Sequence, residues 1–568
     1  MVDQKGKDHR HSVIVLDDSD DDEEEVQVAS GTSNEVKPVN SMAAIGDRAL
    51  MEKERLERQK KRRREAGLPE EEDSKGNDSV AGPSSKVQKK EPQKVELQNE
   101  NRVNSKEGQN IPLYWSGTIK KSFNIHSKSA PGTPFEEFLR PTTPFRANGL
   151  THVIMTTFCE DIQWLSQMFP KGIESAPEIT MITLAQEGLK AGVYAPLHPQ
   201  LPNWIRLVVP RRGLNEYTTM HMKFIILFYE DRLRLMILSG NLVDYDWRRI
   251  ENTAFIHDFP RLKNDEKDTT SEYGKQMRRI LSSLSVPTGH HAMRMMETYD
   301  MSSKCEAKIV ASIPTFTPVT GWAAIEELGI GRLGKVVRES LGGKMVEVDV
   351  EAQGSSMGSY SPRWLQQFHL ICTGADYKKH LPLPTGAKAV KAWASATNCK
   401  ESEQWPPVKL LFPSDSWVKT KSVEGVNGAL TFFGKKKVSI EKGFIQLIHQ
   451  PISLRGNIMM HHKAIVAIKK GASIAKEKSE EVIGWAYMGS HNLTQAAWGN
   501  ISSGKKGGEV QLSINNWELG IVVPMRSKDL HESQSPLPGS MKANIITWKR
   551  PVEKYKDEDV PWDQFDQR

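Results

Sequence analysis

The stretch TMHMKFIILFYEDRLRLMILSGNLVDYDW, residues 219–247, decides the fold class, because it sets a polar His-x-Lys step into an otherwise apolar, strand-forming run. Successive side chains of an extended strand alternate between its two faces. His221 and Lys223 are therefore predicted to share one face of a buried strand. A tight connection leads to a returning strand over residues 233–238, which ends in a turn and presents Asn241.

A second copy of this pattern lies 240 residues downstream, in MMHHKAIVAI at residues 459–468. His461 and Lys463 are again two positions apart, and a second returning strand leads to Asn492. Each asparagine is followed by Leu at the next position and by Trp at the sixth. A lone His-x-Lys tripeptide is expected by chance, whereas two copies with the same strand, Asn and Trp context indicate an internal repeat.

The runs around the two copies predict an α/β protein with two domains. Strand-like and amphipathic helical segments alternate, which favours a largely parallel or mixed sheet in each domain. We expect a tail over residues 1–110, a first domain over residues 111–302 and a second over residues 303–568. Further strands are expected at residues 149–158, 178–184, 204–209, 251–256, 307–313, 345–350 and 517–523, and helices at residues 161–169, 269–284, 322–328, 330–341 and 362–368, while residues 408–412 and 444–448 flank a loop-rich interval.

The predicted tail is rich in Lys, Glu, Asp, Ser and Gln and has almost no aromatic residues, so it cannot bury enough apolar surface to offset the entropy of ordering. We expect residues 1–110 to be disordered. Val13, Ile14, Val15 and Leu16 precede an acidic run and resemble a SUMO-interacting motif, which adds a strand to the sheet edge of its partner. A chance apolar patch is the alternative.

Composition and charge bound the class of protein. With 568 residues, 38% of them hydrophobic, the chain can bury the cores of several domains. No apolar run approaches the length of a membrane span and residues 1–10 are not a secretory signal, so an intracellular protein is expected. The cluster RQKKRRR at residues 58–64 indicates nuclear localisation or phosphate binding, with a solvated charge run as the alternative. The four cysteines have no zinc or CxxC spacing.

Two further features are candidates for a site. Residues 353–359, QGSSMGS, precede a predicted helix, where backbone N–H groups and hydroxyls can cradle an anion, although an ordinary loop has the same composition. Glu518 puts a carboxylate on a predicted buried strand, and Asn252 occupies the comparable place beside the first copy. A buried carboxylate needs a partner, and a catalytic imidazole is the obvious one.

Two His, two Lys and two Asn side chains that meet at a domain interface would suit phosphoryl transfer. Lysines and asparagine amides can stabilise the charged equatorial oxygens of its transition state. One imidazole can attack phosphorus while the other protonates the leaving oxygen and later activates water. No His, Asp and Glu cluster with metal-ligand spacing accompanies this set in the sequence, so neither a metal nor another cofactor is expected.

The duplicated HxK…N halves resemble the phospholipase D superfamily, which implies a metal-independent two-step route and two pseudo-twofold-related α-β-α sandwich domains. That superfamily usually has HxKxxxxD, but the Asp positions here hold Phe228 and Ile468. The departure is typical of the tyrosyl-DNA phosphodiesterases that act on 3′ ends, and the similarity to them covers roughly residues 112–568. The matching segments are residues 158–170, YTTMH at 217–221, GSS at 354–356, NLTQAAWG at 492–499, WELG at 517–520 and DVPW at 559–562.

The resemblance implies a role for each matching residue. His221 is the expected nucleophile, which displaces the tyrosine of a trapped topoisomerase I peptide, and His461 is the expected general acid and then base. Glu518 and Asn252 are expected to orient the two imidazoles, although the family often has Gln at the latter position. The residues expected to hold the phosphoryl oxygens are Lys223, Lys463, Asn241 and Asn492, and those expected to line a groove for single-stranded DNA are Tyr217, Ser355, Ser356 and Thr494.

Hydrolysis of 3′-phosphotyrosyl bonds is therefore the leading hypothesis, with a phosphohistidine intermediate and a 3′-phosphate product. We expect a monomeric nuclear DNA-repair enzyme that acts on single- and double-stranded DNA 3′ ends and tolerates other blocked ends. The pKa of a phenol is about 10, against roughly 15 for an alcohol, which favours tyrosyl ends over internal phosphodiesters. A general nuclease or lipid phosphodiesterase of the same superfamily, and a non-catalytic DNA-end-binding scaffold, are the alternatives.

Overall fold

The computed structural model describes residues 113–139, 149–169, 177–184, 194–198, 201–210, 214, 218–263, 266–287, 289–384, 387–397, 404–472, 478–504, 508–537 and 539–564. The predicted tail lies outside these ranges, together with its motif from Val13 to Leu16 and its basic cluster at residues 58–64. Tyr217, one of the expected DNA contacts, also lies outside them.

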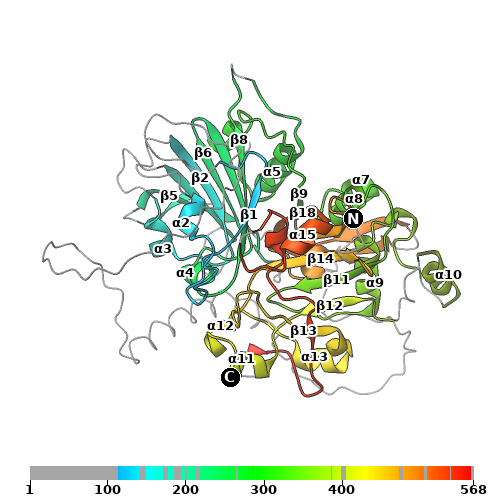
Figure 1. Ribbon diagram of the computed structural model, residues 1–568. Coiled ribbons are helices and arrows are strands. Elements are labelled where there is room, and N and C mark those ends of the chain that lie inside the picture. Colours follow the sequence, from blue (N-terminus) through cyan, green and yellow to red (C-terminus); the bar gives the residue numbers. More distant parts are fainter. Residues whose placement is uncertain are drawn as a thin grey trace, which may run out of the picture.

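An eight-stranded mixed sheet is built from the first half of the described chain (Figure 1). Its strands in spatial order are β1 (Thr118–Lys121), β8 (Thr253–Pro260), β7 (Arg232–Leu238), β6 (Phe224–Tyr229), β2 (Leu150–Thr156), β3 (Glu178–Leu184), β5 (Leu201–Val209) and β4 (Tyr194–His198). The centre is the antiparallel hairpin of β6 and β7, whose turn at residues 230–231 matches the predicted tight connection. β2 runs antiparallel to β6 but parallel to β3, so the sheet is mixed.

A second eight-stranded sheet repeats the first position by position. Its strands in the corresponding order are β9 (Lys308–Ser312), β18 (Glu518–Arg526), β15 (Val482–Gly489), β14 (Lys463–Lys469), β11 (Val348–Gln353), β12 (Val408–Leu411), β13 (Ile448–Gln450) and β19 (Glu553–Lys554). β11 is antiparallel to β14 and parallel to β12, as β2 is to β6 and β3. The predicted α/β class with two related mixed sheets is thereby confirmed. The last position differs in origin, because β4 precedes β5 in the chain whereas β19 follows every other strand of its sheet.

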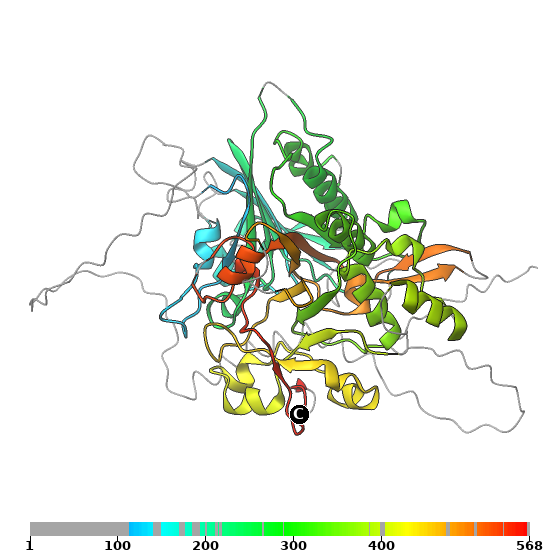
Figure 2. The same cartoon turned by 45° about the vertical axis from the view of Figure 1, so that its right-hand side comes forward.

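The central strands are buried on both faces, which is typical of sheets covered by helices on each side. In β6, Phe224, Ile226 and Phe228 belong to an apolar core shared by both sheets, whereas Ile225 and Leu227 belong to an outer core. This is the alternation that the sequence predicts for the strand. Helix α5 (Glu272–Ser283) contributes to the shared core, and Figure 1 shows it beside β9, at the junction of the two sheets, which remain distinct in the turned view of Figure 2.

Helices cover the outer faces of both sheets. The first sheet packs against α2 (Phe135–Leu139), α3 (Ile162–Ser166) and α4 (Asp244–Arg248), and the second against α8 (Gly329–Ser340) and α9 (Pro362–Cys372). No helix in the ranges given above is long and apolar enough to cross a membrane. The structure also contains α6 (His291–Met296), α7 (Trp322–Ile325), α10 (Ala387–Thr397), α11 (Asp415–Thr420), α12 (Gly425–Gly428), α13 (Lys436–Glu441), α14 (Gln495–Trp498), α15 (Ser527–Glu532), the 3₁₀ helices η2 (Tyr377–Lys379) and η5 (Ala543–Ile545), and a small sheet of β10 (Val319–Thr320), β17 (Gly508–Ser513) and β16 (Asn500–Gly504).

Residues 444–448, expected only to border a loop-rich interval, belong to two different elements. Phe444–Leu447 form a 3₁₀ helix, and β13 begins one residue later. Phe444 and Leu447 are three positions apart and both are buried, which fits a helix with three residues per turn. A short apolar run cannot be distinguished from a buried helical turn by its periodicity.

The two halves are joined where each His-x-Lys segment enters its sheet. His221 donates its backbone N–H to the carbonyl of Trp517 at 3.0 Å, and Trp517 donates in return to the carbonyl of Thr219 at 2.9 Å. The other copy repeats this exchange, since the backbone N–H of His461 donates to the carbonyl of Glu251 at 3.0 Å. Each histidine is therefore held by the opposite half of the molecule.

The strands begin after the histidines rather than at them. β6 starts at Phe224 and β14 at Lys463. The prediction that His221 and Lys223 both lie within a strand is therefore wrong, because the backbone at His221 pairs across the junction instead of within its own sheet. This shift places the two histidines at the interface between the halves.

A buried ion pair fixes this junction. Nε of Arg455 donates to Oε1 of Glu251 at 2.8 Å, and each side chain is 1% exposed. The hydroxyl of Ser453 donates to the other carboxylate oxygen at 2.5 Å, and Nη1 of Arg455 donates to the carbonyl of Ser122 at 2.9 Å. Because Glu251 also accepts the backbone N–H of His461, the ion pair stabilises the position of that histidine.

Replacing Arg455 with Met should lower the free energy of unfolding by about 3–5 kcal/mol, because it leaves the Glu251 carboxylate buried without its cation. Urea-induced unfolding measures the change. Lys437→Met is the matched control, since Lys437 is 86% exposed in its pair with Glu441 and its loss should cost less than about 0.5 kcal/mol. Equal losses in the two variants would contradict the role of the buried pair.

Candidate active site

The imidazole of His221 is backed by a carboxylate from the other half. Nδ1 of His221 lies 2.8 Å from Oε2 of Glu518, the first residue of β18. An ionised carboxylate accepts hydrogen bonds, so Nδ1 carries the proton and Nε2 of the neutral ring keeps its lone pair. The His221 side chain is 16% exposed and that of Glu518 1%, so the ring lies at the boundary of the site and its carboxylate behind it.

Two further side chains fix the carboxylate of Glu518. The hydroxyl of Ser490 donates to Oε2 at 2.5 Å, and Nδ2 of Asn516 donates to Oε1 at 3.3 Å. Burial raises the pKa of Glu518, while the charges of neighbouring groups, Lys223 among them, lower it. The carboxylate is therefore held in one orientation toward His221 by donors on both of its oxygens.

The imidazole of His461 lies beside a different carboxylate. Its Nδ1 is 3.1 Å from Oδ2 of Asp246, and the two side chains are 4% and 0% exposed. Its Nε2 is 3.2 Å from Nζ of Lys463. Burial and the cation of Lys463 lower the pKa of His461 to about 4, against the opposing effect of Asp246. In the free protein this ring is therefore neutral near pH 7.

Asn252, which we expected to orient this imidazole, directs its amide elsewhere. Its Oδ1 accepts the hydroxyl of Ser239 at 2.9 Å, and its Nδ2 donates to the backbone carbonyl of Asp246 at 2.7 Å. The equivalence with Glu518 that the sequence predicts is nevertheless visible, because Ser239 contacts Asn252 as Ser490 contacts Glu518. The carboxylate next to the second histidine is that of Asp246.

Both lysines are buried between these groups. Nζ of Lys223 donates to the carbonyl of His221 at 2.8 Å, and Nζ of Lys463 donates to the carbonyl of His461 at 2.7 Å. Burial lowers the pKa of Lys223 to about 8, although the charge of Glu518 opposes this shift. The pKa of Lys463 falls well below its usual value through burial and repulsion from Lys223. The two side chains thus repel each other, and an anion bound between them would reduce this repulsion.

The two asparagines of the repeat, Asn241 and Asn492, are buried, with 4% and 7% exposure. Oδ1 of Asn492 accepts the backbone N–H groups of Ser355 and Ser356 at 3.0 and 3.1 Å, so its amide N–H₂ is left to face another acceptor. The carbonyl of Asn241 accepts Nε1 of Trp247 at 2.7 Å, which accounts for the Trp six positions after this asparagine. Both asparagines are therefore positioned by their neighbours.

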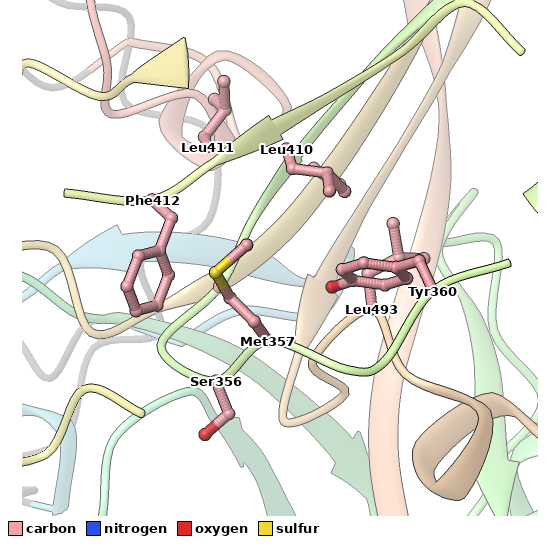
Figure 3. A pocket seen from close by; sticks show the side chains of 9 residues that line it. Ser356, Met357, Tyr360, Leu410, Leu411, Phe412 and Leu493 are labelled. Atoms are coloured by element: carbon pink, nitrogen blue, oxygen red, sulfur yellow. The ribbon is translucent and has the colours of Figure 1, made fainter. Parts of the chain in front are cut away.

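The expected DNA contacts are placed in different ways. Ser355 is 2% exposed, and the expected anion cradle uses its N–H groups at residues 355 and 356 to hold Asn492. Ser356 is partly exposed and lies at the rim of a pocket that is otherwise lined mainly by apolar residues (Figure 3). The hydroxyl of Thr494 accepts the backbone N–H of Ala497 at 3.2 Å and caps α14.

Sequence reasoning missed Asp246, Ser239, Ser490 and Asn516. A signal for the two serines was present, because each stands two positions before the asparagine of its copy, in Ser-Gly-Asn and Ser-His-Asn. Asp246 has no counterpart in the second copy, where the residue five positions after Asn492 is Ala497. A comparison of the two copies therefore could not single it out.

The chemistry of the site follows from its donor set. Two imidazoles can exchange a lone pair and a proton, and two lysines with two amides can hold the oxygens of a phosphoryl group. Among the described residues, no group of three or more His, Cys, Asp and Glu side chains is placed to hold a metal ion. The positive charge of the described site lies on Lys223 and Lys463.

Comparison with solved structures gives the class of the fold. The yeast tyrosyl-DNA phosphodiesterase superposes with a TM-score of 0.54, over 79% of this chain and 100% of the yeast chain, at 14% sequence identity. This likeness shows an α/β fold with twin mixed sheets like that of the yeast protein.

Comparison with sequences gives the family. The family model described as Tyrosyl-DNA phosphodiesterase matches residues 134–561. Tyrosyl-DNA phosphodiesterase 1 from Arabidopsis thaliana is 23% identical over 460 residues, which cover 72% of this chain and 68% of that protein. A probable tyrosyl-DNA phosphodiesterase from Caenorhabditis elegans is 25% identical over 332 residues, 54% of this chain and 62% of that protein. This chain belongs to the tyrosyl-DNA phosphodiesterase family, and so it is a phosphodiester hydrolase.

The lowered pKa of Lys223 predicts how anion binding depends on pH. The affinity for tungstate, a tetrahedral oxyanion, should weaken as the pH rises through about 8, because Lys223 then loses the charge that attracts the anion. Isothermal titration calorimetry from about pH 7 to about pH 9.5 measures this step. In Lys223→Arg the guanidinium stays charged, so the step near pH 8 should disappear. An unchanged step in that variant would assign it to another group.

Proposed function

We propose that this chain hydrolyses the 3′-phosphotyrosyl bond between DNA and the peptide of a trapped topoisomerase I. The proposed route passes through a covalent phosphohistidine, uses no metal ion and leaves a 3′-phosphate. The observation that carries it is the pair of imidazoles, His221 and His461, each with Nδ1 beside a buried carboxylate and each next to a buried lysine. Membership of the family supports the choice of DNA adducts as substrates.

In the first step Nε2 of His221 attacks the phosphorus of the diester. A phosphorus–nitrogen bond forms while the bond to the phenolic oxygen breaks, and the electron pair of that bond leaves with the oxygen. His461, as an imidazolium, gives its Nε2 proton to the phenolate, so that neutral tyrosine departs. Lys223 and Lys463 neutralise the charge on the non-bridging oxygens, to which the amides of the two asparagines donate.

The protonation of His461 depends on the substrate. In the free protein its pKa is lowered to about 4 by burial and by the cation of Lys463. A phosphodiester held between the lysines brings one negative charge, which favours the imidazolium and raises this pKa. Tyrosine needs little help to leave, because the pKa of a phenol is about 10. Poor protonation of His461 therefore slows the first step less than loss of its function as a base slows the second step.

In the second step His461, now neutral, takes a proton from water through Nε2. The water oxygen bonds to phosphorus, and the phosphorus–nitrogen bond breaks with its electron pair returning to Nε2 of His221. The products are a 3′-phosphate on the DNA and a neutral His221 ring. Glu518 stabilises His221 in both steps, since Nδ1 keeps its proton beside the carboxylate throughout.

The same chemistry suits other blocked 3′ ends whose leaving groups are good, on single- or double-stranded DNA. We include in the proposal a DNA-repair role in the nucleus, for which the basic cluster at residues 58–64 supplies the localisation signal. Val13 to Leu16 would bind SUMO or SUMO-modified proteins by strand addition. Among the three expected DNA contacts that are described, Ser356 and Thr494 are half-buried and Ser355 is buried.

Alanine variants of the two histidines test the mechanism. His221→Ala should abolish turnover of a 3′-tyrosyl oligonucleotide in EDTA, because no nucleophile remains. His461→Ala should form a denaturant-stable protein–DNA adduct, because the second step lacks its base. Gel electrophoresis after denaturation detects the adduct. Undiminished turnover in both variants would contradict the mechanism, and tight DNA binding without turnover in the unaltered protein would indicate a scaffold.

The leaving group provides a separate test of the substrate. A 3′-tyrosyl oligonucleotide should be cleaved faster than an internal phosphodiester by several orders of magnitude, because a difference of about 5 in leaving-group pKa acts on the first step. Rates are measured on both oligonucleotides under the same conditions, with phosphatidylcholine vesicles as a third substrate. Comparable cleavage of internal bonds would point to a general nuclease, and release of the lipid headgroup would point to a lipid phosphodiesterase.

A further inference from the structure

The two histidines differ in the origin of their carboxylates. Glu518 stands at the start of β18, and the equivalent position before β8 holds Asn252, whose amide is directed to Ser239 and to the backbone of Asp246. The carboxylate beside His461 comes instead from α4, on the outer side of the first sheet. Both imidazoles thus lie beside a carboxylate, but one carboxylate comes from a strand and the other from a helix.

We infer that Asp246, and not Asn252, is the positioning residue of His461, holding the proton on Nδ1 so that Nε2 serves as the acid and base of the reaction. This inference rests on the proposed function, because it assigns a partner to the general acid and base named there. It goes beyond that proposal because it names Asp246, which has no equivalent in the second copy of the repeat.

The carboxylate and the backbone of Asp246 are held by contacts other than the one with His461. Its Oδ2 accepts the backbone N–H of Asn241 at 2.7 Å, and this same oxygen lies 3.1 Å from Nδ1 of His461. The backbone of Asp246 is held as well, because its carbonyl accepts Nδ2 of Asn252 at 2.7 Å. The side chain is 0% exposed. One oxygen thus couples an asparagine of the phosphate-holding set to the histidine of the other half.

Asn252 has little freedom to replace Asp246 in this role. Its Oδ1 is used by the hydroxyl of Ser239, and its amide packs against Gly240, where an added Cβ would lie 2.8 Å from Cγ of Asn252. A swing of the amide toward His461 would give up its bonds to Ser239 and to Asp246. Asn252 therefore supports Asp246, and Asp246 supports the imidazole.

The charges around His461 make this carboxylate necessary for the reaction. Lys463 lies against Nε2, and Lys223 adds a second cation that disfavours the imidazolium. His462, the next residue, is buried and neutral, since burial and the cation of Lys463 lower its pKa to about 3. Asp246 is the anion that opposes the cations at His461. Without it, the ring would lose both its preferred tautomer and its stabilising charge.

Asp246→Asn tests the inference with a side chain of the same shape. With a 3′-tyrosyl oligonucleotide in single-turnover experiments, formation of the covalent adduct should persist, while its hydrolysis should slow by roughly 100-fold or more, as expected for an imidazole held in the wrong tautomer. The acid limb of the pH profile of hydrolysis should move to lower pH, because removal of the anion lowers the pKa of His461. A purely structural role of Asp246 would not move that limb.

Asp244→Asn is the matched control. It removes the same charge from the same helix, but at a side chain that is 37% exposed and 3.6 Å from Arg248. Adduct formation and hydrolysis should both keep the rates of the unaltered protein. Accumulation of adduct in this control would show that any loss of charge on α4 disturbs the site, which would overturn the inference.

The outcomes separate this inference from the proposed function. If Asp246→Asn hydrolyses its adduct at the unaltered rate while His461→Ala stalls, the inference is wrong and the proposed function stands. If Asn252→Ala stalls and Asp246→Asn does not, the positioning residue is Asn252. If neither histidine variant loses activity, the proposed function itself is wrong. Should Asp246→Asn fail to fold, histidine ¹⁵N NMR of the unaltered protein decides, because a His461 ring protonated on Nε2 in place of Nδ1 would overturn the inference.

Discussion

The reciprocal backbone exchange between the halves is the constraint on which the rest of the structure depends. Trp517 and Glu251, the residues that accept the N–H groups of His221 and His461, each stand one position before a predicted orienting residue. The exchange therefore brings each imidazole to the entrance of a strand of the opposite sheet. Neither half-site is complete by itself, because the carboxylate beside each ring belongs to the other half. This arrangement also holds two buried ammonium groups near each other in the free protein, a repulsion that the binding of an anion relieves.

The fold was largely predictable from the sequence, because the signals that specify it are local and repeated. Strand periodicity around Phe224 and Lys463 identified the two central hairpins, and the matching Asn and Trp positions related the halves. The prediction of strands at the two histidines failed for a physical reason. There the backbone conformation is decided by pairing with the start of a strand in the opposite half. Such tertiary pairing leaves no mark in the periodicity of the segment itself.

The site was predictable to the extent that it is symmetric. The His, Lys and Asn residues recur in both copies, and contacts in the structure link five of these six, His221, Lys223, Asn241, His461 and Lys463, directly or through Asp246. Asp246 breaks the symmetry, so the comparison of copies pointed to Asn252, which occupies the equivalent position with a side chain directed elsewhere. The repeat does not show that the carboxylate beside His461 comes from the short helix α4, whereas the carboxylate beside His221 comes from a strand. Asymmetry of this kind suits two rings that must do different things, since one binds phosphorus and the other carries a proton.

The edge strand β19 has a consequence for the order of events during synthesis. The first sheet needs nothing beyond Pro260, whereas the second lacks its outer strand until Glu553 and Lys554 have left the ribosome. Trp562, which is fully buried and donates its indole N–H to the carbonyl of Ala429, is synthesised after that strand. A ribosome-bound chain therefore carries one finished sheet whose histidine has no opposite half to hold it. A nascent chain of this protein should remain catalytically silent until His461 and Glu518 have been synthesised, whatever the stability of its first half.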